Sequence, residues 1–180
     1  MRAIIEKMRA RAFWKAVTVD HSDFLDSLIA LLAEGGIRYC VIGGQAVNAY
    51  VEPLVSLDLD LVVAVDQMAG AEAMLRERFK VERFPHSLNV ESAGSDLRVQ
   101  IRTDPRYFAF VDRADSREVL GVTLPVAALE DVLQGKIWAA SDPRRRPSTR
   151  RKDLLDIERI LESQPSLRAL VPATILDRLA

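Results

Sequence analysis

Asp58 and Asp60 are the residues of this sequence whose type and spacing are best suited to chemistry. They stand two apart in the apolar segment SLDLDLVV, residues 56–63. Side chains two apart on a strand point to the same face, so the two carboxylates should project together. Their leucine and valine neighbours predict burial, and two adjacent buried anions need a cation. Paired oxygens of this kind suit a hard divalent metal such as magnesium.

A glycine pair, Gly43-Gly44, follows an apolar strand that we expect at residues 38–42. Residues 45–50 should then form one or two helical turns. Glycine lets a backbone approach a ligand closely, and the free amides at a helix N-terminus bind phosphate. Alone, such a pair is more often a simple tight turn. Followed by the two aspartates it is a much more specific pattern, and residues 41–63 become the predicted centre of function.

The segments around this centre predict the scaffold that would hold it. Helices are expected at residues 24–34, 67–79 and 152–162, and a strand passing into an amphipathic helix is expected at residues 122–140. Further strands are expected at residues 55–65, 80–84, 87–91 and 97–103. Strands in the centre and helices towards the C-terminus predict an α+β fold with a mixed central β-sheet, flanking helices and a helical C-terminal part. The expected divisions are residues 1–20 as an arm or helix, 21–125 as the α/β core and 126–180 as the helical region.

The composition is that of an ordinary globular protein, with 49% hydrophobic and 28% charged residues and a net charge of −1 over 180 residues. With Cys40 as its single cysteine, the chain cannot form an internal disulfide, and together with two histidines this argues against a structural zinc site. No apolar run approaches the roughly 20 residues that span a bilayer. The N-terminal residues do not form a convincing signal peptide, so the cytoplasm is the expected compartment.

The glycine pair and the aspartate strand together resemble the polymerase-beta-like nucleotidyltransferase superfamily. The matching motifs are VIGGQA at residues 41–46 and SLDLDLVV at residues 56–63. Over residues 25–163 the chain looks most like AbiEii-type and other minimal bacterial nucleotidyltransferases. The resemblance implies a nucleotidyltransferase fold in which two magnesium or manganese ions bridge a nucleoside triphosphate while a hydroxyl attacks its α phosphorus. It gives Asp58 and Asp60 as metal ligands, and it gives phosphate contacts to Gly43, Gly44 and Ser56.

Two positions depart from the pattern of active members. Leu54 stands where an arginine is common, and Gln100 stands where a third carboxylate is expected on the neighbouring strand. Gln100 can offer a metal a neutral oxygen, but it neither neutralises the metal nor acts as a base. Arg98 and Arg102 share the face of Gln100, and these cations could bind phosphate or replace the charge of a metal.

These observations leave two hypotheses for function. The first is a protein that binds a nucleoside triphosphate with magnesium and transfers a nucleoside monophosphate to RNA, such as tRNA, or to another hydroxyl. The second is a catalytically impaired binding module, such as an antitoxin or a protein partner. Whether the chain is an enzyme depends on Gln100.

Lys136 falls in the middle of the apolar stripe that Leu129 and Leu133 form on their helix. Its ammonium could reach solvent along a buried stem, or it could contact a phosphate. AbiEii-type proteins resemble this chain, with a helical lysine and a later Lys-Asp pair that matches Lys152-Asp153. The resemblance implies nucleotide binding by Lys136 and Lys152 and a catalytic part for Lys136 and Asp153. Asp153 could equally be a first-turn acid favoured by the helix dipole.

A basic run at residues 144–152 follows a polar turn that begins at Asp142. Such a run suits RNA or phosphate binding, but a solvated connector balanced by Asp142 and Asp153 accounts for it equally well. The resemblance also suggests a partner protein of the toxin–antitoxin kind. The residues that we expect to contact RNA are Arg144, Arg145, Arg146, Arg150 and Arg151.

Overall fold

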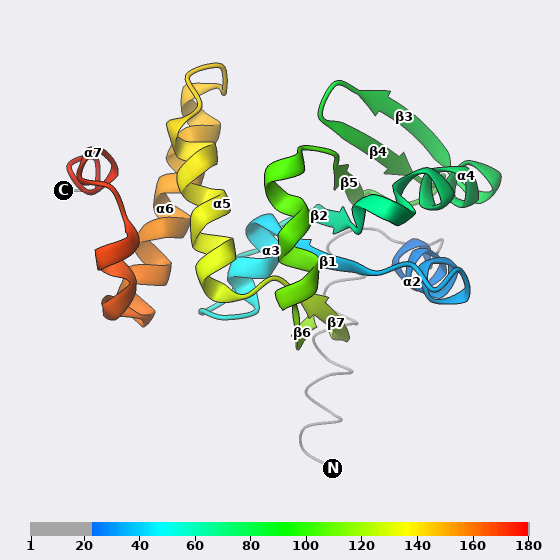
Figure 1. The fold of residues 1–180 in the computed structure, drawn as a ribbon, viewed down its shortest axis with the longest axis horizontal. Coiled ribbons are helices and arrows are strands. Elements are labelled where there is room, and N and C mark those ends of the chain that lie inside the picture. The colour runs from blue at the N-terminus through cyan, green and yellow to red at the C-terminus, as the bar shows by residue number, and fades with distance from the viewer. Residues whose placement is uncertain (1–22, 180) are drawn as a thin grey trace, which may run out of the picture.

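A seven-stranded mixed β-sheet forms the centre of the molecule (Figure 1). The computed structural model describes residues 23–179, so the arm expected over residues 1–20 lies outside the described residues. The sheet order is β3-β4-β5-β2-β1-β7-β6. The strands are β1 (Tyr39–Ile42), β2 (Asp58–Val63), β3 (Lys80–Phe84), β4 (Ser87–Glu91), β5 (Arg98–Arg102), β6 (Asp115–Val119) and β7 (Val122–Val126).

The pairing of the strands confirms the predicted mixed sheet. β2 runs parallel to β5, and β1 runs parallel to β7. The remaining neighbours are antiparallel, including β1 with β2 and the hairpin of β4 and β5. With helices flanking this sheet, the fold is α+β, as the sequence predicts.

The helices gather in two groups at opposite sides of the sheet (Figure 1). α2 contacts α4 on one side, and α5 packs along α6 on the other, where α3 also contacts both α5 and α6. The α-helices are α2 (Phe24–Glu34), α3 (Gly43–Asn48), α4 (Met68–Arg78), α5 (Leu129–Ser141), α6 (Pro147–Ser163) and α7 (Ala173–Leu176), and the 3₁₀ helices are η1 (Val65–Gln67), η2 (Pro105–Arg113) and η3 (Pro165–Leu170).

The hydrophobic core runs along the central strands. Consecutive side chains of β1 and β2 are buried, including Val41, Ile42 and Val62. Such continuous burial is typical of strands covered on both faces, and it gives β2 the rigidity that a site residue needs. Cys40 belongs to this core, and its burial raises the pKa of the thiol to about 12. The thiol is therefore an inert core group.

α3 begins at Gly43, two residues before the expected start, and two further elements differ from the expectation. β6 was not predicted, because its sequence DSREV is mostly polar and its strand lies at the edge of the sheet, where exposed positions carry no apolar pattern. The basic connector is shorter than predicted, since α6 already begins at Pro147. Proline is well suited to a first helical position because its missing N–H would lack a helical partner there in any case. Arg150 and Arg151 are consequently helical residues.

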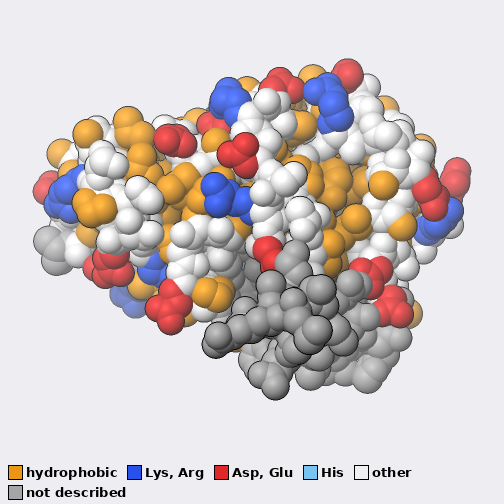
Figure 2. Space-filling model, turned by 90° about the horizontal axis from the view of Figure 1, so that it is seen from below, with side chains coloured by type: hydrophobic (Ala, Val, Ile, Leu, Met, Phe, Trp, Pro, Cys, Tyr) orange, Lys and Arg blue, Asp and Glu red, His pale blue; other side chains and the backbone are white. Residues whose placement is uncertain are grey.

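The helices and one face of the surface can be compared with what a membrane-spanning protein needs. No helix within residues 23–179 is long and apolar enough to cross a bilayer. On the face shown in Figure 2, basic and acidic side chains are scattered among apolar and neutral ones. Clusters of charged side chains also line the cleft described next.

Candidate functional site

Asp58 and Asp60, the predicted metal ligands, are the first and third residues of β2. The side chain of Asp58 is 55% exposed, whereas that of Asp60 is 19% exposed. The prediction of two buried carboxylates is therefore wrong for Asp58. This residue is exposed because it is the first residue of β2 and lies at the open end of that strand. Burial raises the pKa of Asp60, and the charges of Arg102 and Lys136 oppose that rise.

The two glycines that begin α3 have different structural roles. Gly43 has φ +69°, and a Cβ added there would lie 2.4 Å from Asp60 Oδ2. Gly43 is thus required both by its backbone conformation and by the side chain of Asp60. A Cβ added to Gly44 would meet nothing within 4 Å. The space beside Gly44 is open to a ligand.

The loop before β2 is held by α3. Gln45 donates through Nε2 to the Ser56 carbonyl at 2.9 Å, and Ser56 Oγ accepts from the Asp58 N–H at 3.3 Å. Asn48 donates to the Leu54 carbonyl at 2.7 Å and accepts from the Leu54 N–H at 3.0 Å. These bonds fix the backbone that leads into Asp58, so Ser56 serves the loop as well as lining the cleft.

Gln100 is the direct partner of Asp60 on the neighbouring strand β5, the strand on which the resemblance places the third carboxylate. Its Nε2 donates to Asn89 Oδ1 on β4 at 2.9 Å. Gln100 can therefore offer a metal only a neutral carboxamide oxygen beside Asp60. No third carboxylate occupies this position.

Two arginines of β5 pair with the aspartates of β2. Arg98 Nε lies 2.8 Å from Asp58 Oδ1, and Arg102 Nη2 lies 3.4 Å from Asp60 Oδ1. In these ion pairs the arginines balance the carboxylates, as the positive charge of a metal would, whereas phosphate binding by Arg98 and Arg102 stays a prediction.

Lys136 is enclosed between α5 and α6, with its side chain 10% exposed. Its Nζ lies 3.1 Å from Asp153 Oδ1 and 2.7 Å from Asp156 Oδ2. The snorkelling hypothesis is wrong, because the ammonium ends on two buried carboxylates and not in solvent. Burial lowers the pKa of Lys136, but the charges of Asp156 and Asp153 raise it by more, so the net shift is upward and the side chain stays protonated.

Further ion pairs extend this cluster in both directions. Arg145 Nη2 lies 3.2 Å from Asp153 Oδ2, and Arg159 Nη1 lies 2.7 Å from Asp156 Oδ1. Arg159 also donates to Asn48 Oδ1 at 3.1 Å and to the Glu52 carbonyl. The C-terminal helices are thereby tied to the loop that precedes the aspartate strand.

Sequence reasoning missed Asp156, Arg159 and Asn48. Asp156 carried a usable signal, since it follows Asp153 by three positions and so lies on the same face of α6. Arg159 extends the same face. The role of Asn48 depends on how the chain turns before Leu54, and its neighbours in the sequence do not reveal it.

The site residues meet in one cleft formed by three adjoining hollows, all lined by Asp60 and Arg145. The first, of about 270 Å³, lies between α3, the loop before β2 and α6. The second, of about 250 Å³, lies over β4 and β5 and is lined by Gln100 and both β5 arginines. The third is small and reaches under η2. The predicted residues that line the first hollow are Gly44, Ser56, Asp58, Asp60, Lys136, Lys152 and Asp153.

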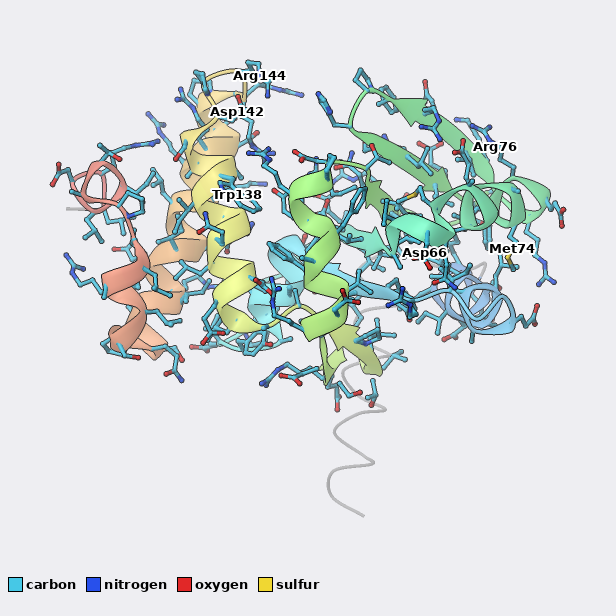
Figure 3. All side chains as sticks on the ribbon, viewed as in Figure 1. Asp66, Met74, Arg76, Trp138, Asp142 and Arg144 are labelled. Carbon is cyan, nitrogen blue, oxygen red and sulfur yellow. The ribbon has the colours of Figure 1, made fainter. Side chains whose placement is uncertain are left out.

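Only Arg145 of the five predicted RNA-binding arginines joins this cleft. Arg144 lies at the turn between α5 and α6 beside Asp142 (Figure 3), with its Nε 3.0 Å from Asp142 Oδ1. Hydrogen bonds from Arg144 lower the pKa of Asp142 to about 2. Arg150 and Arg151 line a separate shallow hollow together with Arg178. The expected balance of the basic run by Asp142 and Asp153 is therefore present in the structure.

Several solved structures have a fold similar to that of this chain. The crystal structure of ANT(2")-Ia in complex with adenylyl-2"-tobramycin is similar, with 16% identity and a TM-score of 0.59 over 87% of this chain and 97% of that one. The lincomycin-bound lincosamide antibiotic adenylyltransferase LnuA has 14% identity and a TM-score of 0.50 over 79% and 99%. An antigenic nucleotidyltransferase-like protein from Paracoccidioides brasiliensis has 16% identity and a TM-score of 0.50 over 82% and 92%.

These low identities establish the fold alone. A comparison with curated proteins found no match to the sequence. The model of the family described as "Nucleotidyl transferase AbiEii toxin, Type IV TA system" matches residues 43–180, from the first glycine of the pair to the last residue. Because that match covers well over half of the sequence, the chain belongs to the AbiEii family of nucleotidyltransferases.

Proposed function

We propose that this chain binds a nucleoside triphosphate with magnesium or manganese in the cleft and transfers a nucleoside monophosphate to a hydroxyl acceptor. One observation carries the proposal. The Asp58–Asp60 pair, the open space at Gly44 and the Lys136–Asp153 pair come from separate parts of the sequence, and they all line the same hollow. Carboxylates for a metal and cations for phosphate are the groups that phosphoryl-group chemistry needs.

The triphosphate is proposed to lie along α3 and α6. Gly44 leaves room for a close approach to the backbone, and Lys152 lines the same hollow from α6. Ser56, whose hydroxyl accepts a hydrogen bond from the Asp58 N–H, lines the same hollow and would contact the phosphates there. Lys136 stays protonated between Asp153 and Asp156. With Arg145 and Arg159, the cations of this wall outnumber its two carboxylates.

The donor set fits a metal that brings most of its own ligands. Within residues 23–179, no group of three or more histidine, cysteine, aspartate or glutamate residues could hold a metal ion. Asp58 and Asp60 with the carboxamide of Gln100 make a smaller set. Mg²⁺ is commonly held by one or two carboxylates together with substrate phosphates and water, and this set suits that arrangement. A metal bound there would neutralise charge on the phosphates and orient them for attack.

RNA is the acceptor class that the surface charges favour, and tRNA is our first candidate. Arg144 and Arg146 are exposed at the turn before α6, and Arg150 and Arg151 continue the basic surface along it. Polyanion binding needs such a cluster when the net charge is near zero. The family's type IV toxin–antitoxin context further suggests an antitoxin partner, and a nucleotide substrate favours the cytoplasm as the compartment.

A second candidate function is a binding module that holds the nucleotide without transferring it. Gln100 favours it, since this neutral residue stands opposite Asp60 where a third carboxylate would complete the metal site. Such a protein would keep the cleft and its charges but lack the full charge of a catalytic metal centre.

The two candidates separate in a transfer assay. The protein is incubated with labelled nucleoside triphosphates, magnesium or manganese, and bulk tRNA. The enzyme predicts labelled RNA, with labelling lost in Asp58→Asn and Asp60→Asn and kept in Asp66→Asn, which changes an exposed aspartate outside the cleft. Nucleotide binding without transfer to RNA, protein or small hydroxyl acceptors would instead support the binding module.

A further inference from the structure

Arg98 and Arg102 occupy the positions beside the carboxylates where a metal would carry the positive charge. The sheet register places them there, because Arg98 is the direct cross-strand partner of Asp58. Gln100 is the partner of Asp60, and Arg102, two positions further along β5, reaches back to Asp60. The two ion pairs therefore follow from the pairing of β2 with β5 and do not depend on a mobile loop.

The formal charges of these four side chains cancel. A divalent ion that enters from water meets two carboxylates already neutralised by guanidinium groups, together with an uncharged Gln100. The site attracts the free ion only weakly, because the positive charges of Arg98 and Arg102 repel a divalent cation. Binding would require at least one arginine to leave its aspartate.

A metal ion that arrives bound to a triphosphate meets a different balance of charges at the site. Its phosphates offer the arginines new anionic partners, and the planar guanidinium fork matches phosphate oxygens well. Arg98 is 68% exposed, and an ion pair as exposed as this one contributes little, so its exchange is easy. Arg102 is more enclosed, and it lines both the hollow over β5 and the one under η2, so it borders space that a ligand can enter.

We propose that Arg98 and Arg102 are the resting counter-ions of Asp58 and Asp60 and that they move to phosphate oxygens when the metal–nucleotide complex binds. The inference rests on the proposed function and adds an order of binding to it. The divalent cation enters together with the nucleoside triphosphate, and the protein without nucleotide retains the free ion poorly. Specificity for a metal–triphosphate complex over the free metal is then a property of β5.

Manganese binding tests this without any turnover. Mn²⁺ is titrated by calorimetry and by electron paramagnetic resonance, with and without the non-hydrolysable analogue α,β-methylene ATP. The double variant Arg98→Gln/Arg102→Gln should bind free Mn²⁺ about tenfold more tightly than the native protein, because the competing charges are gone. Its affinity for the Mn²⁺–analogue complex should fall by about tenfold, because the phosphates lose two partners.

Matched variants separate this effect from a change in overall charge. Arg38→Gln/Arg78→Gln removes the same charge from exposed pairs outside the cleft and should leave both affinities unchanged. Arg98→Lys/Arg102→Lys keeps the charge and should keep weak binding of the free ion. Adding Asp60→Asn to the glutamine double variant should abolish the gain, which would place the extra Mn²⁺ at this site.

Two results would overturn the inference, and they differ in what they say about function. If the native protein binds the Mn²⁺–analogue complex but the glutamine variant shows no gain for free Mn²⁺, the arginines do not compete with the metal, and the proposed function still stands. If the native protein binds neither free Mn²⁺ nor the complex, the proposed function fails and the inference fails with it.

Discussion

The ammonium of Lys136 lies 2.7 Å from Asp156 Oδ2, and the two side chains are only 10% and 13% exposed. This contact joins α5 to α6. Asp156 also forms an ion pair with Arg159, and Arg159 donates a hydrogen bond to Asn48 in α3. The wall of the cleft is therefore held by charges that compensate one another out of water. Such a network is stable only while its members remain paired.

Replacing Lys136 by methionine should strongly destabilise the protein. The change leaves Asp153 and Asp156 with one buried partner fewer, and removing one member of a buried pair costs about 3–5 kcal/mol. Urea denaturation followed by circular dichroism measures this loss as a lower unfolding free energy. Lys80→Met is the control, because Lys80 makes a similar lysine–carboxylate pair with Glu91 at the surface and should change stability little. Equal effects of the two changes would contradict the buried network.

The glycine pair should respond asymmetrically to alanine. Gly43→Ala forces a side chain into a positive-φ backbone and against Asp60, so the unfolding free energy should fall by about 1–3 kcal/mol. Gly44→Ala meets only open space, so its effect on stability should stay within about 0.5 kcal/mol. Denaturation of both variants, together with calorimetric titration of α,β-methylene ATP, checks this. If Gly44→Ala leaves nucleotide affinity intact, the space beside it is not the phosphate site.

Asp60 should cost the protein stability at neutral pH. Burial raises the pKa of Asp60, so the folded protein binds a proton at Asp60 more readily than the unfolded chain does. The stability that this proton contributes is fully present below the ordinary aspartate pKa of about 3.9, and it is lost as pH rises through the raised pKa. Asp60→Asn removes the buried charge. Its Tm should exceed that of the native protein by about 2–4 °C near neutral pH, and the difference should shrink as the solution becomes acidic.

Calorimetric melts over a pH series test this relation. Asp58→Asn serves as the control, because Asp58 is more exposed and its replacement should shift Tm less. A lower Tm for Asp60→Asn at neutral pH would show that the ion pair with Arg102 outweighs the burial of the carboxylate.

Gln100→Asp should complete the metal site. The change places a carboxylate opposite Asp60 in the same register, so Mn²⁺ affinity in the presence of nucleotide should rise by about tenfold or more. If the native protein is impaired at this position, transfer activity should rise with it. Gln100→Asn is the matched neutral control and should show neither gain. Unchanged affinity in the aspartate variant would mean that position 100 does not face the metal.

The sequence alone determined the parts of the molecule that depend on local pattern. The alternation of apolar residues with Asp58 and Asp60 predicted their common face, and the glycine pair predicted the turn into α3. Hydrophobic periodicity also located most helices and strands, because amphipathic burial repeats within a single element. The polar edge strand β6 escaped detection, since an exposed strand has no such repeat.

The tertiary structure decided which charges meet. The sequence marked Lys136 as unusual on an apolar stripe, but its partners Asp153 and Asp156 belong to the next helix, and the packing of α5 on α6 brings them together. The pairing of Arg98 and Arg102 with the aspartates likewise depends on the register of β2 against β5. Periodicity records which side of an element is buried, whereas ion pairing over a few ångströms depends on how separate elements pack, and only the folded chain fixes that.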